Sequence, residues 1–338
     1  MPRFSRVSVA SLAYLDAPHR VPSSDVEERL APLYKRLGMP KGVIASLSGV
    51  VARRFWDEGT LPSEVAARAG ESALAAAGID RERVGILVST SVCRDHLEPS
   101  VACKVHQQLR LPGACLNFDI ANACLGFLNG MDIVSAMIER GDVEFGLVVD
   151  GEGSRFTVEK TIERLAERGD ARAFAEEFAT LTLGSGTAAM VLGRSDSVRD
   201  GHAYAGSVSL AASQHNGLCR GDAERMVTDG PRLMVAGLEL AQQTFAMAQR
   251  ELGWSAETLD EVVIHQVSRL HTEKLAAALG VDVSKIHGIY EEHGNVGPAS
   301  VPMVLAKSAE LGRLRRGHRV GLLGIGSGLN CTMAQIDW

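Results

Sequence analysis

Cys124 is the residue of this sequence whose surroundings best suit covalent chemistry. Segment 116–127 passes from a strand-like stretch through small residues into a nearly all-apolar helix, which places Cys124 at the expected helix start. Unpaired N–H groups and the positive end of the helix dipole favour a thiolate there, and the thiolate is the nucleophilic form of cysteine. Ala123 and Gly126 leave space beside the sulfur. The alternative is a packed cysteine in a buried helix.

Two further residues could act on the same substrate. His265 directly follows the apolar run 262–264, at the carboxyl end of an expected buried strand, where open α/β sheets place ligand sites. Asn295 lies in a glycine-bounded turn ahead of a helix, where it could simply cap the helix or form the turn. The functional alternative is that the Asn295 amide and the His265 ring converge on one oxygen atom.

A glycine-rich loop and an acidic loop complete the candidate residues. Segment 324–328 resembles a dinucleotide loop only superficially, because a Rossmann loop opens a helix and here a strand-like stretch follows. We therefore reject nucleotide binding, and the backbone N–H of this loop could instead stabilise an oxyanion. Glu98 precedes a proline, and its local context is typical of a solvated turn residue.

The elements that must position these residues alternate between short apolar runs and helical patterns. This alternation predicts an α/β protein whose central strands are covered on both faces. We expect a first strand within 1–18 and further strands at 85–89, 146–149, 262–264 and 320–323. The best helix candidates are 63–77, 124–139, 233–252, 270–279 and 298–311.

A weak internal repeat divides the chain into halves at 1–195 and 196–338. In each half an asparagine precedes an apolar helix, an Arg-Gly turn, a strand and two glycines, and these asparagines are Asn122 and Asn295. Duplication would place both helix starts near a pseudo-twofold axis. Segment 156–178 reads as a helical insertion, which is either a solvated surface or a cap over a substrate channel or subunit contact.

Length, composition and charge exclude several classes of protein. The 338 residues are 46% hydrophobic, so the chain can bury a large core. A net charge of −6 without a compact polybasic run gives no general reason to bind nucleic acid or an anionic membrane. With no spanning apolar run and no evident secretory signal, we expect a soluble, cytoplasmic protein. The six cysteines lack metal-site spacing, which indicates free thiols and no metal.

Taken together and in order, the motifs resemble the ketoacyl-carrier-protein synthase III branch of the thiolase superfamily. They are Asn122 to Phe127, His265-Gln266, His293 to Asn295 and Gly326 to Asn330. More narrowly, segments 90–100, 149–152, 293–300 and 323–331 look like the superfamily members that condense two long-chain acyl-coenzyme A (acyl-CoA) molecules head to head in bacterial olefin biosynthesis. The resemblance covers essentially the whole chain.

The resemblance implies a thiolase fold, with duplicated βαβαβαββ halves in a five-layer αβαβα arrangement, and a homodimer. It implies a catalytic triad of Cys124, His265 and Asn295, and an oxyanion site formed by the N–H groups of Cys124 and Gly328. Glu98 would reach into the partner subunit's site as the base. The implied cofactor set is empty, because the CoA thioesters are substrates.

The reaction implied by the resemblance is a non-decarboxylative Claisen condensation through an acyl-Cys124 intermediate, which yields a 2-alkyl-3-keto acid and CoA. Enzymes that process this product are the further implied partners. One alternative is a decarboxylating 3-oxoacyl-carrier-protein synthase III with a malonyl extender, which would need no base such as Glu98. Another is a non-catalytic thiolase-like subunit, against which the retained Cys124, His265 and Asn295 argue.

Overall fold

Two half-sheets form the frame of the computed structural model, which describes residues 3–338. The first half-sheet has the order β5-β4-β6-β7-β1 and the second the order β11-β12-β13-β8. They join through a single short ladder, in which Ser8 and Val9 pair with Ala203 and His202. The strands are β1 (Val7–Asp16), β4 (Val84–Ser89), β5 (Leu116–Asp119), β6 (Phe145–Glu152), β7 (Gly186–Arg194), β8 (His202–Ala211), β11 (Glu261–Ile264), β12 (Arg319–Gly326) and β13 (Asn330–Asp337).

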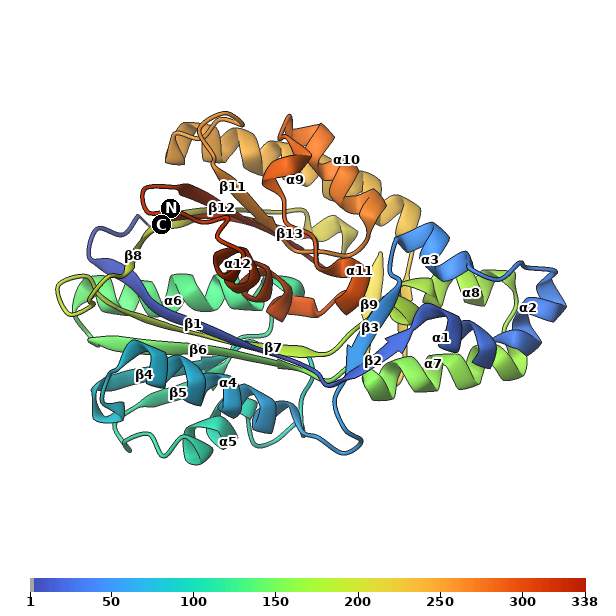
Figure 1. Cartoon of the computed structure of the whole chain (residues 1–338), viewed down its shortest axis with the longest axis horizontal. Coiled ribbons are helices and arrows are strands. Elements are labelled where there is room, and N and C mark those ends of the chain that lie inside the picture. Colours follow the sequence, from blue (N-terminus) through green and yellow to red (C-terminus); the bar gives the residue numbers. More distant parts are fainter. Residues whose placement is uncertain (1–2) are drawn as a thin grey trace.

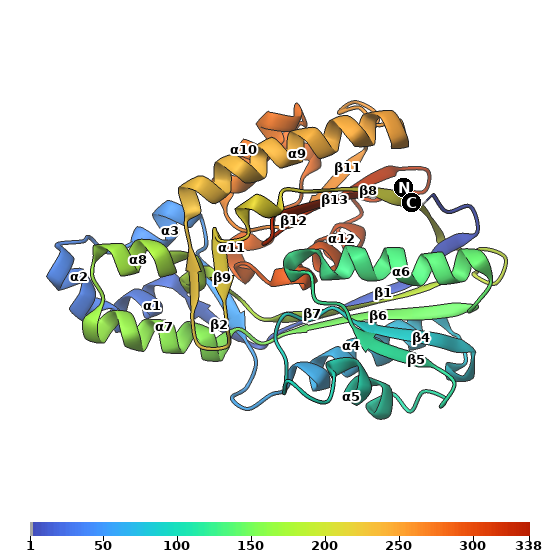
Figure 2. The same cartoon turned by 180° about the vertical axis from the view of Figure 1, so that it is seen from behind.

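Helices cover both half-sheets and also separate them, which gives five layers (Figure 1). The expected αβαβα arrangement is thereby confirmed. Figure 2 shows the middle layer from behind, with α6 lying between the two half-sheets. The outer layers contain α4 (Pro62–Ala77) and α5 (Val101–Gln108) on one side, and α9 (Gly230–Leu252) and α10 (Arg269–Leu279) on the other; the middle layer contains α6 (Gly126–Arg140) and α12 (Ser300–Glu310).

The halves repeat each other, except that the second has no counterpart of β5 among residues 3–338. The stretch between α10 and α12 forms short helical turns instead: η5 (Val283–Lys285), α11 (Tyr290–His293) and η6 (Gly297–Ala299). The turn that carries Asn295 lies between the last two of these. The boundary predicted between residues 195 and 196 remains a prediction, and the chain passes there from β7 to β8.

The main core lies in the middle layer, where apolar side chains from both half-sheets meet α6 and α12. Burial of each such side chain contributes about 1.5–3 kcal/mol. Gly146 of β6 allows α6 to lie close, because a Cβ at this position would collide with the side chains of Val134 and Ile86. The middle helices are thus fixed from both faces, and their first residues are held rigidly.

A helical unit projects beyond one end of the sheets (Figure 1). Its own apolar cluster contains Val26, Leu33, Val158 and Leu165, and α7 packs against α1 and α2. The predicted insertion at 156–178 is therefore helical, but it is packed rather than a purely solvated surface. The elements here are β2 (His19–Pro22), α1 (Ser23–Arg29), α2 (Ala31–Leu37), α3 (Val43–Ser48), β3 (Ala52–Phe55), α7 (Arg155–Arg168), α8 (Ala171–Glu177), β9 (Cys219–Gly221) and β10 (Met226–Thr228).

Two predicted helix starts are wrong by two residues. The helix predicted at 124–139 begins at Gly126, because residues 123–125 form the 3-10 turn η2. The helix predicted at 298–311 likewise begins at Ser300, after the turn η6. Both differences fall at the functional segments. The helix predicted at 233–252 begins earlier, at Gly230, and the strands predicted at 146–149 and 320–323 extend further, to Glu152 and Gly326. The other predicted elements agree closely with the observed bounds.

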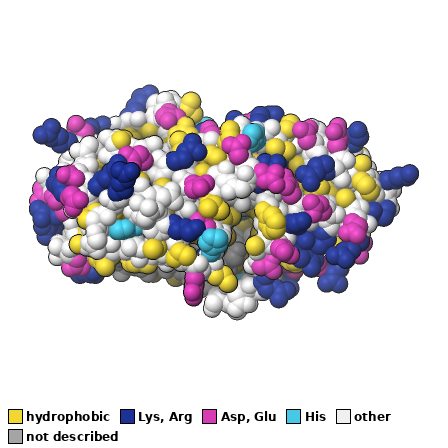
Figure 3. Space-filling view, turned by 90° about the horizontal axis from the view of Figure 1, so that it is seen from below, with side chains coloured by type: hydrophobic (Ala, Val, Ile, Leu, Met, Phe, Trp, Pro, Cys, Tyr) yellow, Lys and Arg dark blue, Asp and Glu magenta, His cyan; other side chains and the backbone are white. Residues whose placement is uncertain are grey.

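The molecular surface carries charges of both signs. On the face shown in Figure 3, acidic, basic and apolar side chains are interspersed. Within residues 3–338, no helix is long and apolar enough to cross a membrane.

Candidate active site

Cys124 lies in the sharp turn η2 that connects β5 to α6, and its side chain is half-buried. The preceding residue, Ala123, has a φ of 44°, which costs a non-glycine residue about 1–2 kcal/mol. Asn122 anchors the turn, since it donates to Asn129 (Nδ2 to Oδ1, 2.6 Å) and accepts from Asn330 (Nδ2 to Oδ1, 3.1 Å). A strained, anchored turn between a strand and a helix is the arrangement that presents a nucleophile.

The glycine hairpin between β12 and β13 covers this turn. A Cβ placed on Gly326 would lie 3.4 Å from the backbone N of Cys124 and 3.4 Å from the carbonyl oxygen of Asn122. Gly326 therefore lets the hairpin approach the cysteine directly. The sequence interpretation assigned the oxyanion role to Gly328, which lies at the hairpin turn with a φ of 148°. That role remains a prediction.

His265 follows β11 as expected, and its backbone N–H donates to the Leu323 carbonyl (2.8 Å), which ties it to the end of β12. The side chain is buried, and among residues 3–338 its Nδ1 has no hydrogen-bond partner. Burial, and next the neighbouring His271, lower the pKa of His265 to about 3, although a hydrogen bond with the Gly297 backbone opposes the shift. The ring is therefore neutral, and its N–H can donate a hydrogen bond to a carbonyl oxygen.

Asn295 is held by backbone bonds on both sides. Its N–H donates to the Thr182 carbonyl, and its carbonyl accepts from Gly184, each at 2.9 Å. The side-chain Oδ1 accepts from the N–H of Gly297 at 3.0 Å. The amide Nδ2 is thereby left as the donor that can meet a substrate oxygen. Gly297 thus anchors the Asn295 side chain.

The three triad candidates come from turns that pack together. The cysteine turn η2 contacts η6, which follows Asn295, and it also contacts β12, which pairs with the His265-bearing strand β11. The expected proximity of the two asparagine-bearing helix starts is confirmed. One half of the chain thus supplies the thiol, and the other supplies the imidazole and the amide.

The ionisation expected for Cys124 is wrong in direction. Burial raises the pKa of the Cys124 thiol to about 12, and the carboxylates of Glu152 and Asp150 add to this effect. Neither factor is visible in the local sequence, and the α-helix expected to start at Cys124 begins only at Gly126. The free protein holds a thiol, so a reaction at the sulfur would require its proton to leave during the attack.

A buried acidic pair at the end of β6 was not assigned a role from sequence. Burial raises the pKa of Glu152 to about 7, and burial together with the charge of Glu152 raises the pKa of Asp150. Glu152 accepts from the backbone N–H groups of Val92 (2.6 Å) and Cys93 (3.3 Å). The available signal was a pair of carboxylates closing an otherwise apolar strand, where an unpaired charge would be costly.

Glu98 lies at the exposed tip of the loop 91–100. Within residues 3–338 no hydrogen bond or ion pair engages its carboxylate, whereas neighbouring Asp95 accepts from Ser63 (Oγ to Oδ2, 2.6 Å) and pairs with Lys104 (3.0 Å). The loop is therefore anchored while its tip projects outward. In this single chain Glu98 is not bonded to the triad candidates.

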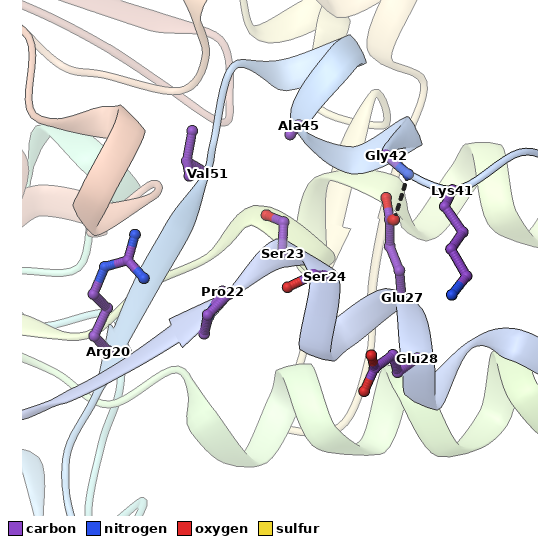
Figure 4. Close-up of a pocket in the computed structure, with 10 residues that line it drawn as sticks. All are labelled: Arg20, Pro22, Ser23, Ser24, Glu27, Glu28, Lys41, Gly42, Ala45 and Val51. Atoms are coloured by element: carbon purple, nitrogen blue, oxygen red, sulfur yellow. Dashed lines mark hydrogen bonds between the residues drawn. The ribbon is translucent and has the colours of Figure 1, made fainter.

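The surface cleft drawn in Figure 4, of about 360 Å³, lies in the helical unit and includes none of these residues. It is bounded by charged side chains, and Glu27 is already engaged there by the Gly42 N–H at 2.5 Å. Among residues 3–338, no group of three or more His, Cys, Asp or Glu side chains could hold a metal ion.

Comparison with known proteins places this site in a family. The family model for 3-oxoacyl-[acyl-carrier-protein] synthase III matches residues 118–211, and the model for its C-terminal region matches residues 249–338. An acyl-CoA:acyl-CoA alkyltransferase of Xanthomonas campestris is 50% identical over 336 residues, which cover 99% of both chains. The chain belongs to the OleA family of the thiolase superfamily. A second alkyltransferase, from Shewanella oneidensis, is 38% identical over 99% of this chain and all of its own length.

Solved structures of OleA proteins support the same family assignment. The cerulenin-bound OleA of X. campestris superposes with a TM-score of 0.98 at 50% identity, covering 99% of this chain and 98% of that one. Another OleA structure, with bound lauric acid and lauroyl-CoA and a serine in place of a cysteine, gives a TM-score of 0.97 at 49% identity, with coverage of 99% and 100%. Other OleA structures carry substitutions at a glutamate and at a histidine.

Proposed function

We propose that this protein condenses two long-chain acyl-CoA molecules head to head, without decarboxylation, to a 2-alkyl-3-keto acid and CoA. The observation that carries the proposal is the packing of the Cys124, His265 and Asn295 turns around Gly297 and Gly326 in a member of the OleA family. The reaction is an acyl transfer that forms a carbon–carbon bond, and it requires a nucleophile, an enolate site and a base.

The first half-reaction loads Cys124. Its sulfur attacks the thioester carbonyl of one acyl-CoA, and the thiol proton leaves to the departing CoA thiolate, directly or through a neighbouring group. The backbone N–H groups of Cys124 and Gly328 are the proposed oxyanion donors. The products are acyl-Cys124 and free CoA.

The second half-reaction makes the new bond. Neutral His265 and the Nδ2 of Asn295 donate hydrogen bonds to the carbonyl oxygen of the second acyl-CoA, which stabilises the enolate formed when a base removes the α-proton. Glu98 of the other subunit is the proposed base. The α-carbon attacks acyl-Cys124, the cysteine sulfur leaves, and water hydrolyses the remaining thioester to the keto acid and CoA.

A homodimer is part of the proposal, because Glu98 is exposed and not bonded to the triad of its own chain. Large apolar side chains are exposed on the Glu98 loop and on β5, the edge strand beside it. Leu97 is 90% exposed, which is unusual for leucine in a protein that acts alone. The group consists of Val92, Leu97, Leu116 and Phe118. A second copy would cover these side chains and place Glu98 in its site.

The remaining expectations are kept as proposals. The six free cysteines agree with a reducing compartment, which supports the cytoplasm. The site has a nucleophile, donors and a base within its own side chains, which supports a reaction without a cofactor. A free keto acid would pass to a further enzyme that reduces it.

The deciding experiment supplies acyl-CoA alone, with no malonyl donor, and analyses the products by mass spectrometry. We expect a 2-alkyl-3-keto acid or the ketone derived from it, and none from Cys124→Ser. Product that appears only with malonyl-carrier protein would instead support a decarboxylating synthase, a class whose member from Neisseria meningitidis is 27% identical over 293 residues. Absence of an acyl adduct on Cys124 would support a non-catalytic subunit.

A further inference from the structure

Glu152 connects two functional segments that lie far apart in the sequence. Its carboxylate receives the backbone N–H groups of Val92 and Cys93, the first residues of the loop that carries Glu98. On its other side lies Gly297, where a Cβ would sit 3.5–3.6 Å from the Glu152 carboxyl group. The backbone carbonyl of Glu152 is also engaged, by the indole N–H of Trp56 at 2.9 Å. Glu152 is thus fixed from several directions.

The bonds to Val92 and Cys93 anchor the near end of the Glu98 loop. At the same end, the Gly151 N–H donates to Ser91 (2.8 Å). At the far end, Asp119 accepts from the N–H groups of Val101 (3.1 Å) and Ala102 (2.8 Å). Glu98 lies between these anchors and has no bond of its own within residues 3–338. Its position therefore depends on them.

A carboxylate suits the Glu152 position better than an amide does. Oε1 accepts from Val92 and Oε2 accepts from Cys93, so both oxygens are used as acceptors. Glutamine could accept only one of these bonds and would turn an NH₂ group toward the other backbone N–H. The uncompensated donor would then be buried, which loosens the start of the loop.

We propose that Glu152 is a positioning residue that sets the Glu98 loop, and thereby serves the partner subunit's site. The inference rests on the proposed function, in which Glu98 acts across the dimer. A misplacement of about 1 Å can slow a reaction about 100-fold. Loss of Glu152 should slow condensation while leaving the loading of Cys124 in the same subunit intact.

The first test separates the half-reactions of Glu152→Gln. We expect acylation of Cys124 by a long-chain acyl-CoA to be no slower than in wild type, because the lost charge of Glu152 is one that opposes ionisation of the thiol. We expect condensation to be reduced at least about tenfold. Asp132→Asn is the matched control, because Asp132 is also a buried carboxylate, and its two oxygens accept from Tyr204 (2.7 Å) and Ser207 (2.6 Å). If Asp132→Asn shows the same selective loss, or Glu152→Gln slows both half-reactions equally, the inference is wrong.

The second test uses dimers with one reactive site, purified through two different affinity tags. One subunit carries Cys124→Ser, so only the other subunit can be acylated, and that site uses Glu98 of the Cys124→Ser subunit. Glu152→Gln should impair condensation when it lies in the Cys124→Ser subunit. It should have little effect when it lies in the acylated subunit. The reverse pattern would show that Glu152 acts at its own site and would overturn the proposal.

Glu98→Ala is tested in the Cys124→Ser subunit and in the acylated subunit in the same way. This control distinguishes failure of the proposed base Glu98 from failure of the proposed role of Glu152. Loss only when Glu98→Ala lies in the Cys124→Ser subunit supports the cross-subunit base. Loss only in the acylated subunit contradicts the proposed function itself, and the inference about Glu152 then fails with it. If Glu98→Ala follows the cross-subunit pattern and Glu152→Gln does not, the inference about Glu152 fails alone.

Discussion

Cys124 is partly accessible, and its thiol holds its proton strongly. Its side chain is half-buried, yet burial and the nearby carboxylates raise the pKa of its thiol to about 12. A cysteine of this kind is protected from oxidants and alkylating agents, which react with the thiolate. In the proposed reaction it becomes a nucleophile when a thioester is bound and the oxyanion and departing CoA share the charge.

The protonation of Cys124 can be tested by alkylation. Because its pKa lies near 12, the rate of carbamidomethylation by iodoacetamide should rise about tenfold per pH unit between pH 8 and 10, with no plateau. Peptide mass spectrometry follows Cys124 separately, and exposed Cys103 in the same digest reports the reagent. A plateau below pH 9 would show that the free enzyme already holds a thiolate.

His265 predicts an effect of pH on stability. Its folded-state pKa of about 3 lies below the ordinary value of 6.5, so the unfolded chain binds more protons between these two values. The contribution of neutral His265 therefore falls as pH falls below 6.5, by about 1.4 kcal/mol per pH unit.

The measurement is urea unfolding of wild type and His265→Asn at pH 7, 6 and 5. As the pH falls, the unfolding free energy of wild type should decrease more than that of the variant. His96→Gln, at an exposed position, controls for the loss of an imidazole. A difference that stays constant with pH would contradict the buried neutral state of His265.

Individual site residues differ in how well sequence can identify them. His265 follows a strong apolar run and is located by the end of a strand. Cys124 precedes an apolar run and is located by the start of a helix. The ionisation of Cys124 could not be predicted, because Glu152 is brought near it only by folding. Glu98 has no local signal at all, and its assignment comes from resemblance.

Among the elements, the turn before η6 depends most on its backbone. Gly294 has a φ of 67° and a ψ of −159°, a region open essentially to glycine alone, and an added Cβ would collide with the Thr182 carbonyl oxygen. Thr182 is the residue whose carbonyl holds Asn295. A methyl group at Gly294 should therefore displace the Asn295 amide, the proposed donor to the substrate.

Gly294→Ala should lower stability and condensation together, whereas Gly280→Ala serves as its control. Gly280 also has a φ of 67° but nothing lies within 4 Å of its Cβ position, so only the backbone cost of about 1–2 kcal/mol applies. Urea unfolding and product formation are measured for both. Wild-type turnover in a folded Gly294→Ala protein would show that this turn tolerates displacement.

The elements were largely predictable, because buried strands and amphipathic helices leave clear periodic patterns. The two helix starts that were predicted too early have one cause. η2 and η6 interrupt the predicted helices where Ala123 and Gly297 take positive φ values of 44° and 55°. Composition favours a helix at both places, whereas the packing of the two turns against each other imposes the irregular backbone.

For the whole molecule, Leu97→Asp combined with Phe118→Asp should yield a monomer. Both side chains are exposed beside the edge strand, and two buried like charges would oppose pairing of copies. The monomer should still load Cys124 but should not condense, because it lacks Glu98 of a second subunit. Light scattering gives the mass, and Val283→Asp, at an exposed apolar position elsewhere, is the control. A monomer that condenses at the wild-type rate would refute the cross-subunit base.

Long-range assembly is the part that the sequence reveals least. The repeat indicated that two helix starts meet, and the structure confirms it. The contacts of Glu152 with Val92, Cys93 and Gly297 join segments separated by long stretches of chain, and no periodicity connects them. The missing counterpart of β5 was also not foreseen, because the stretch before Asn295 has apolar residues that could equally form a strand.

The narrow junction between the half-sheets bears on how the chain could be divided. The connection from β7 to β8 crosses exposed residues, including Asp196 and Asp200, and interrupts no strand. A cut there would leave two pieces joined by a two-residue ladder, two isolated β-bridges and a large common apolar core. Each piece would depend on the other for solubility, and each would hold only part of the reacting groups. Such a split enzyme would regain activity only when its two fragments reassociate. Its turnover would therefore report on the association of the fragments.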